Sequence, residues 1–230
     1  MNEPGSFGEF FLDGDYVGWD EALTKAFNET ISQEEKDQYN LLAVSSYAFN
    51  VVQRFNNITQ HEIDHPRAMK PLRDFELPTK FAIKFENSKE FGSLIELTDR
   101  LLAVDEPLRA VIEDLEPGVH QFWPIEIAQA DGSVLPKQYY GMRIRQYKDS
   151  FLPEQSAPAS FTDEGSGCHV FSFTLKHCKA LKVSSEAIGG AHLWKERKLR
   201  SPRVFLSDTL VERIRDAGLR IPNVHQLTEV

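Results

Sequence analysis

Residues 61–65 read His-Glu-Ile-Asp-His, a spacing that supports metal chemistry in other proteins. In zinc hydrolases it places both imidazoles on one face of a helix, with the glutamate beside them as general base. Here Pro66 follows the second histidine directly, and the residue before a proline disfavours the helical conformation that such a site requires. We therefore expect His61 and His65 to be surface residues that bind no metal.

A second group with metal-binding residue types is formed by Cys168-His169 and His177-Cys178, which flank an apolar stretch. Structural zinc sites usually take ligands about two to four residues apart, and adjacent ligands are difficult to aim at one ion. Buried thiols beside ordinary histidines are the simpler interpretation, although the sequence leaves open whether the four side chains meet. Two cysteines in a chain of 230 residues do not make a disulfide framework.

Other familiar catalytic patterns are missing. The sequence contains no G-x-G-x-x-G, no G-x-x-x-x-G-K-[ST] and no G-x-S-x-G motif, and no pair of carboxylates stands out. We therefore predict no catalytic residue, no cofactor and no metal ligand. A small metal-dependent enzyme that uses one of the two histidine-containing groups is the alternative.

The net charge of −9 is concentrated at one end of the chain. Residues 1–40 contain ten acidic and two basic residues, which gives −8 and leaves −1 for residues 41–230. Such a segment is either ordinary solvated surface or a negative surface that speeds encounter with a basic partner. Nucleic acid is a poor candidate partner because phosphate binding needs positive charge, so we expect no nucleic-acid partner. The candidate partner-binding residues are Asp13, Asp15, Asp20 and Glu21.

Large aromatic side chains are the second source of candidate contacts. Trp123, Tyr139, Tyr140 and Trp194 are expected to pack in a core, although aromatic residues also anchor protein interfaces. We include Trp194 with the acidic residues as a candidate for partner binding. No apolar run approaches about 18 residues, so we expect a cytoplasmic protein without a membrane partner.

The best-defined elements lie between residues 101 and 151. Asp105 is suited to cap a helix over residues 105–115, in which Leu108, Val111, Ile112 and Leu115 form one apolar stripe. A strand over residues 119–127 would place Trp123, Ile125 and Ile127 on one face and His120, Pro124 and Glu126 on the other. A turn at Asp131-Gly132 leads to a strand over residues 139–147, which alternates apolar side chains with Arg143 and Arg145.

Weaker patterns flank this central part. A helix is expected over residues 19–27, and Ser32 with Glu35 forms a capping box for a second helix that continues through the apolar positions Leu41 to Val52. Near the C-terminus, Ser207 should cap a helix that ends at Gly218. The predicted class is α+β: an antiparallel or mixed sheet with short capped helices packed against it, and a more helical acidic N-terminal region. We place the domain boundary between residues 1–90 and 91–230.

Several of these features resemble a family of immunity proteins from bacterial polymorphic toxin systems, the eleventh immunity family. They are the capped helix with its Glu116-Pro117-Gly118 exit, the strand at 118–127, the Tyr139-Tyr140 strand, His192-Leu193-Trp194 and the closing segment 203–219. The resemblance covers about residues 94–230. It implies an α+β binding protein that neutralises a cognate protein toxin, which we expect to be basic, and it implies no cofactor and no catalytic residue. An interaction module unrelated to toxins is a further alternative.

Overall fold

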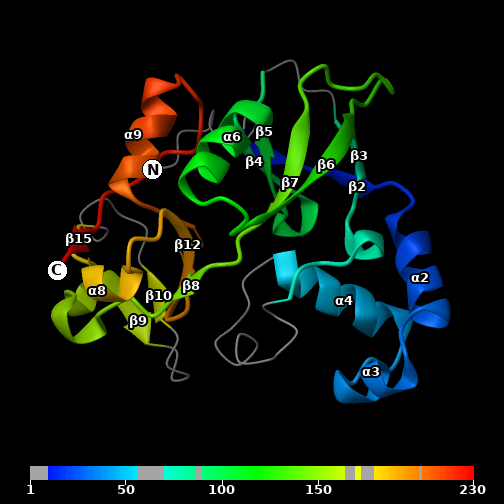
Figure 1. Ribbon diagram of the computed structural model, residues 1–230, viewed down its shortest axis with the longest axis horizontal. Helices are drawn as coiled ribbons and strands as arrows, with labels where there is room; N and C mark the ends of the chain where they lie inside the picture. Colours follow the sequence, from blue (N-terminus) through cyan, green and yellow to red (C-terminus); the bar gives the residue numbers. More distant parts are fainter. Residues whose placement is uncertain (1–9, 56–69, 86–89, 164–168, 172–178, 202–203) are drawn as a thin grey trace. The chain divides into compact units, whose positions relative to one another are not determined.

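The structure is a computed structural model that describes residues 10–55, 70–85, 90–163, 169–171, 179–201 and 204–230. The described residues contain six helices, a mixed sheet of seven strands and smaller sheets, which confirms the α+β class (Figure 1). Two compact units are each built from separate segments, whereas the sequence suggested one boundary near residue 90. Unit 1 comprises residues 1–56, 71–109 and 121–143, and unit 2 comprises residues 57–70, 110–120 and 144–230.

A seven-stranded sheet is the framework of unit 1, with the order β1-β4-β5-β7-β6-β3-β2. Its strands are β1 (Phe11–Leu12), β2 (Gly14–Tyr16), β3 (Lys80–Ile83), β4 (Leu94–Leu97), β5 (Leu102–Asp105), β6 (Gln121–Ala128) and β7 (Tyr139–Arg143). The pairs β1·β4 and β3·β6 are parallel and the others antiparallel. Because β1 and β2 are separated by Asp13 alone, one short segment occupies both ends of the sheet. The sheet therefore curls round and closes on itself, as in a barrel.

Two glycines allow close packing inside this closed sheet. A Cβ atom on Gly141 would lie 2.4 Å from the ring of Trp123, its cross-strand neighbour, and one on Gly14 would lie 2.3 Å from the carbonyl oxygen of Ala82. The indole of Trp123 fills the space above Gly141 and donates from Nε1 to the carbonyl oxygen of Pro78 at 2.9 Å. Trp123 is thus a core residue, as the sequence indicated.

Three helices, α2 (Trp19–Glu29), α3 (Gln33–Gln38) and α4 (Val44–Phe55), belong to the same unit. The prediction of a helix over residues 19–27 is confirmed by α2, whose buried side chains are Trp19, Leu23 and Ala26. The predicted cap of α3 is also confirmed, because Ser32 Oγ accepts from the backbone N–H of Glu35 at 3.1 Å. Short 3-10 turns, η1 (Asp74–Glu76) and η2 (Thr98–Arg100), connect other elements of this unit.

The expectation that the second helix continues through residues 41–52 is wrong. The α3 helix stops because Asn40 adopts a left-handed conformation (φ 52°) and the N–H of Leu41 bonds back to the carbonyl oxygen of Lys36 at 2.8 Å. That pattern is typical of a helix C-terminus. The chain then starts a new helix at Val44, and Leu42, expected on a buried face, is 83% exposed.

The capped helix predicted over residues 105–115 is α6 (Glu106–Leu115). Asp105 Oδ1 accepts from the N–H of Leu108 at 3.0 Å, so the cap is present as predicted. Leu108 and Ile112 on the apolar stripe are both buried. Gly118, with φ 70°, turns the chain after the helix.

Shortening either buried side chain of α6 should destabilise the protein. We expect Leu108→Ala and Ile112→Ala each to lower the free energy of unfolding by about 2–5 kcal/mol, because each removes buried methyl groups and leaves a cavity. Chemical denaturation measures this loss, with the exposed Asp114→Ala as the control on the same helix. Wild-type stability in both core variants would contradict the burial of this stripe.

The strand predicted over residues 139–147 is divided into β7 (Tyr139–Arg143) and β8 (Tyr147–Lys148). Its alternation of apolar and charged residues indicated one solvated face, but Arg143 is only 1% exposed. The reason is its face of the sheet: Arg143 alternates along β7 with the buried Tyr139 and Gly141, against which the core residue Trp123 packs, so all three lie on the core-facing side. The predicted turn at Asp131-Gly132 is confirmed, with Asp131 Oδ1 accepting from the N–H of Ser133 at 2.8 Å.

Unit 2 is assembled from short elements. Its strands are β8, β9 (Phe161–Asp163), β10 (His169–Phe171), β11 (Lys182–Val183), β12 (Leu193–Glu196), β13 (Leu199–Ser201), β14 (Phe205–Leu206) and β15 (Thr228–Glu229). They form the sheets β14-β12-β8, β13-β10-β9 and β11-β15. The remaining elements are α8 (Ser185–Ile188), α9 (Asp208–Asp216), η3 (Pro153–Gln155) and η4 (Pro158–Ser160). A core that includes Phe151, Leu181 and Trp194 holds them together.

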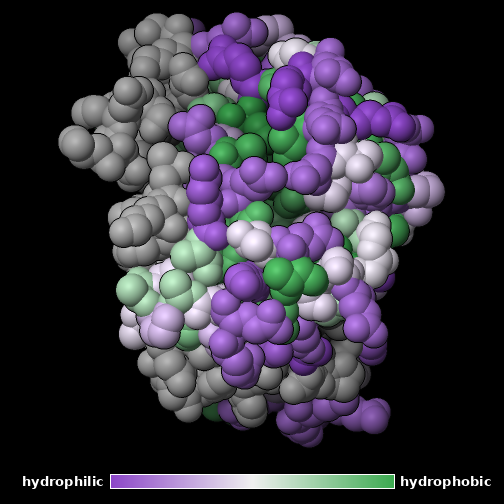
Figure 2. Space-filling model, turned by 90° about the vertical axis from the view of Figure 1, so that its left-hand side faces the viewer, coloured by the Kyte–Doolittle hydropathy of each residue, from purple (hydrophilic) through white to green (hydrophobic). Residues whose placement is uncertain are grey.

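The C-terminal helix agrees with its prediction. Ser207 Oγ accepts from the N–H of Leu210 at 3.2 Å, and Leu210 and Ile214 are buried. Gly218 has φ 65° at the position expected for a helix C-terminus. On the side that Figure 2 shows, hydrophilic side chains predominate and hydrophobic ones form separate groups.

Candidate functional site

The first four candidate residues belong to the segment that closes the sheet and to the helix that follows it. Asp13 and Asp15 alternate along this segment with the buried Leu12 and Gly14, so both carboxylates are exposed. This is the period of two expected for a strand with one solvated face. We call Asp13, Asp15, Asp20 and Glu21 the acidic surface.

Lys84 partly neutralises the acidic surface. Its Nζ lies 3.0 Å from Asp15 Oδ1 and 3.7 Å from Asp13 Oδ1, and the hydrogen bond with Asp15 raises the pKa of this lysine. Exposed pairs of this kind contribute little to stability. The three charges sum to −1, so the pairing leaves the strand negative.

Asp20 and Glu21 occupy the first turn of α2, where unpaired backbone N–H groups favour negative side chains. Gly18 is the N-cap residue of α2, and as a glycine it has no side chain that could accept a hydrogen bond from the first turn. Burial and the negative charge of Asp20 both raise the pKa of Asp99, a further carboxyl group near this end of α2. All four residues of the acidic surface are exposed, as a role in partner encounter requires.

Trp194 lies in a different environment from the acidic surface. It is 4% exposed, belongs to β12 in the core of unit 2, and stacks on Phe205 with ring centroids 5.7 Å apart. We therefore assign Trp194 to core packing and not to the contact surface. The sequence did not distinguish the two roles because a tryptophan in a short strand suits both.

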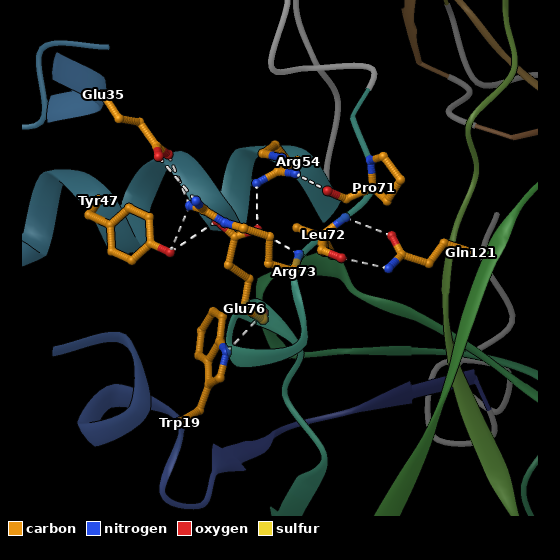
Figure 3. A network of polar contacts seen from close by, with 9 residues as sticks. All are labelled: Trp19, Glu35, Tyr47, Arg54, Pro71, Leu72, Arg73, Glu76 and Gln121. Atoms are coloured by element: carbon orange, nitrogen blue, oxygen red, sulfur yellow. Dashed lines mark hydrogen bonds and ion pairs between the residues drawn. The ribbon is translucent and has the colours of Figure 1, made fainter. Parts of the chain in front are cut away.

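Glu76 is the centre of a buried polar network in unit 1 that the sequence did not reveal (Figure 3). Its carboxylate accepts from Arg54 at 2.9 Å, from the guanidinium of Arg73 at 2.9 Å and from the hydroxyl of Tyr47 at 3.0 Å. Arg73 also forms two hydrogen bonds with Glu35, at 3.0 and 3.1 Å. One feature of the sequence could have indicated this network. Arg54 follows Tyr47 by seven residues and thus lies on the buried stripe of α4, where an arginine needs an acidic partner.

Electrostatics keep Glu76 ionised. Burial opposes its charge, but Arg54, the backbone N–H of Arg73 and the Arg73 guanidinium together lower its pKa to about 2. The backbone around it is also held: Trp19 donates to the carbonyl oxygen of Glu76 at 3.1 Å, and Gln121 bonds both the N–H and the carbonyl of Leu72 at 2.8 Å. A carboxylate with this many fixed donors stabilises the fold.

Glu116 plays the same part in unit 2. Its Oε1 accepts from the side-chain amide of Gln146 and from the N–H of His192 at 2.7 Å, and its Oε2 accepts from the N–H of Leu193 at 3.1 Å. His120 was expected on a polar strand face, but it is buried and its Nε2 lies 2.8 Å from Glu116 Oε2. Burial alone would raise the pKa of Glu116. The hydrogen bonds, chiefly that with His120, outweigh burial and lower this pKa.

A third buried carboxylate, Glu196 in β12, is bound by Ser150. The N–H and the hydroxyl of Ser150 donate to Glu196 Oε2 at 2.8 and 2.6 Å, and the N–H of Lys198 donates to Oε1 at 3.1 Å. Burial raises the pKa of Glu196, although the Ser150 bonds oppose the shift. All three carboxylates thus have several hydrogen-bond donors from the chain itself.

The metal-ligand candidates fall largely outside the described residues: His61, His65, Cys168, His177 and Cys178 do, and His169 is described only as part of β10. Within the described ranges, no group of three or more His, Cys, Asp or Glu side chains is arranged to hold a metal ion. No helix in those same ranges is long and apolar enough to cross a membrane.

Comparison with known families gives the class of this protein. The chain belongs to the immunity protein family Imm11, which it matches over residues 32–224, most of its length. Among curated proteins, none matches the sequence significantly. The matched region includes α3, α4 and the Glu76 network, as well as the central and C-terminal segments on which the resemblance was based. Membership supports an immunity role in general, with a toxin as the class of partner.

Proposed function

We propose that this protein binds a cognate protein toxin in the cytoplasm and neutralises it stoichiometrically, without catalysis. The observation that carries the proposal is the acidic surface on a folded, exposed strand and helix start, in a chain of the immunity family. A negative surface attracts a basic partner and repels nucleic acid and anionic membranes. The toxin we expect is therefore a basic protein.

The proposal is tested with the proteins encoded by the reading frames next to this gene, among which we expect a cognate toxin. Co-expression of the protein should protect cells from that toxin, and the two purified chains should form a complex of fixed stoichiometry on size-exclusion chromatography. Protection without a complex would indicate catalysis or an indirect effect and would contradict neutralisation by binding.

The acidic surface should act mainly on the rate of association. We expect the combined changes Asp13→Asn, Asp15→Asn, Asp20→Asn and Glu21→Gln to slow association severalfold at low salt and to leave dissociation nearly unchanged, because exposed charges steer encounter more than they hold a complex. The difference should fade as salt rises from about 0.01 to 0.1 M, since the Debye length falls from about 30 to 10 Å. Stopped-flow or surface-based kinetics measure both rates.

A matched variant separates the position of the charges from their number. Four exposed glutamates elsewhere can be neutralised for the same change in net charge: Glu126, Glu154, Glu186 and Glu212. This control should associate faster than the variant of the acidic surface. Equal rates in the two variants would assign the effect to net charge alone, and an unchanged rate in both would make the acidic segment ordinary solvated surface.

A further inference from the structure

Two large apolar side chains of unit 1 are exposed at α4. Leu42, just before the helix, is 83% exposed, and Phe49 within it is 63% exposed. Leu42 has the largest exposed fraction of any large hydrophobic residue in the described part of the chain. Exposed apolar side chains are common singly, whereas apolar side chains that gather on one surface are candidates for partner contact.

The backbone holds Leu42 in place although its side chain contacts little. On one side the buried Leu41 bonds to Lys36, and on the other Ser46 Oγ accepts from the N–H of Ala43 at 3.0 Å and donates to its carbonyl oxygen at 2.8 Å. A residue in the position of Leu42 often packs against the fourth residue of the helix, which is Tyr47 here. Its 83% exposure shows that Leu42 does not serve this local purpose.

Phe49 projects from the side of α4 that is opposite the buried stripe. That stripe contains Tyr47, Val51, Arg54 and Phe55, and the ion pair of Arg54 with Glu76 fixes the rotation of the helix about its axis. Leu42 lies two residues before the first residue of α4, and Phe49 is the sixth residue of the helix, so less than two helical turns separate the two positions. The two side chains are thus presented by rigid backbone at a spacing that one partner surface can cover.

The surroundings of this pair are negative. The helix α3 lies beside the start of α4, because Glu35 and Tyr47 both contact Arg73 (Figure 3). Glu34 and Asp37 of α3 are exposed, whereas two cations of these helices are engaged: Lys36 lies over the ring of Phe27 at 4.3 Å and Arg54 is buried. Residues 10–55 hold eight acidic and three basic side chains.

We infer that Leu42 and Phe49 are the apolar anchor by which this protein docks a basic toxin, an inference that rests on the proposed function. Binding energy concentrates in a few apolar side chains that are desolvated at the centre of an interface, with polar residues at the rim. The acidic residues of α3 provide such a rim and complement a basic partner. Both anchor residues also lie within the region that matches the immunity family.

The test uses the purified toxin that the co-expression experiment identifies and measures its binding to full-length variants. Leu42→Ser and Phe49→Ser should each weaken binding about tenfold or more, mainly through faster dissociation. Their thermal stability should match the wild type, because neither side chain is buried. Val134→Ser is the matched control: it removes a 52% exposed apolar side chain of the same unit, away from α4, and should bind as the wild type does.

Each alternative outcome is distinct. If the wild type binds the toxin and a double variant that combines Leu42→Ser with Phe49→Ser binds equally well, the anchor is wrong and the proposed function stands. If the wild type does not bind the toxin, both fall. If ultracentrifugation shows a wild-type dimer that the double variant no longer forms, with toxin binding unchanged, the pair mediates self-association and the docking inference is overturned.

Discussion

Replacing Glu76 by glutamine is expected to lower the free energy of unfolding by about 3–5 kcal/mol, because breaking a buried ion pair leaves its partner charge uncompensated. Arg54 is buried and pairs with Glu76 at 2.9 Å, and Arg73 loses one of its two acidic partners. The amide of glutamine keeps the shape of the side chain but offers one acceptor where Glu76 has two. Urea denaturation at neutral pH measures the change.

The same variant should alter the dependence of stability on pH. Since the folded-state pKa of Glu76 is about 2, below the ordinary value of 4.5, its ionisation stabilises the fold above about pH 4.5. That contribution, about 3 kcal/mol by linkage, is lost as the pH falls from 4.5 towards 2. We therefore expect the wild type to lose more stability than Glu76→Gln over this window, so that their curves converge in acid.

Glu35→Gln provides the control for this network. Glu35 contacts the same Arg73 but is partly exposed, so its loss should cost about 1 kcal/mol or less. If Glu76→Gln is no more destabilising than Glu35→Gln, the buried charges contribute no more than a surface pair, and the structural role given to Glu76 is wrong.

Short-range signals predicted the elements whose ends are fixed by side chains. Asp105, Ser32 and Ser207 each accept the backbone hydrogen bond expected of a cap. These interactions span three residues, so the sequence contains all the information they need. The acidic residues were also predicted to be exposed, because charge on one face of a segment is seldom buried without a partner.

Features that depend on distant residues were not predictable in this way. The face of β7 that carries Arg143 is buried in a sheet whose strands come from distant segments, and the buried His120 contacts Glu116. Leu42 was assigned to a buried stripe because its spacing fits a continuing helix, but the left-handed Asn40 interrupts that helix. An apolar anchor is therefore invisible in the sequence, where an exposed leucine looks the same as a core leucine.

The structure shows why several of the motifs behind the family resemblance occur together: they contact one another through Glu116. Glu116, at the exit of α6, accepts from the backbone of His192 and Leu193, although 76 residues separate Glu116 from His192. His120 Nδ1 accepts from the N–H of Arg145 at 3.3 Å, so its other nitrogen carries the proton and donates to Glu116. Segments recognisable separately along the sequence thus meet at one carboxylate in unit 2.

Glu116→Gln should for this reason cost about 1–3 kcal/mol, since four donors converge on a group that then presents an amide to some of them. The expected loss is greater than for Asp114→Asn, two residues earlier, because the pair of Asp114 with Arg213 at 2.7 Å is exposed on both sides. Denaturation measures the stabilities, and hydrogen exchange at the amides of His192 and Leu193 should accelerate in Glu116→Gln by more than in Asp114→Asn. Equal protection of these two amides in both variants would show that Glu116 does not hold β12. The contacts of the family motifs with Glu116 would then not stabilise the fold.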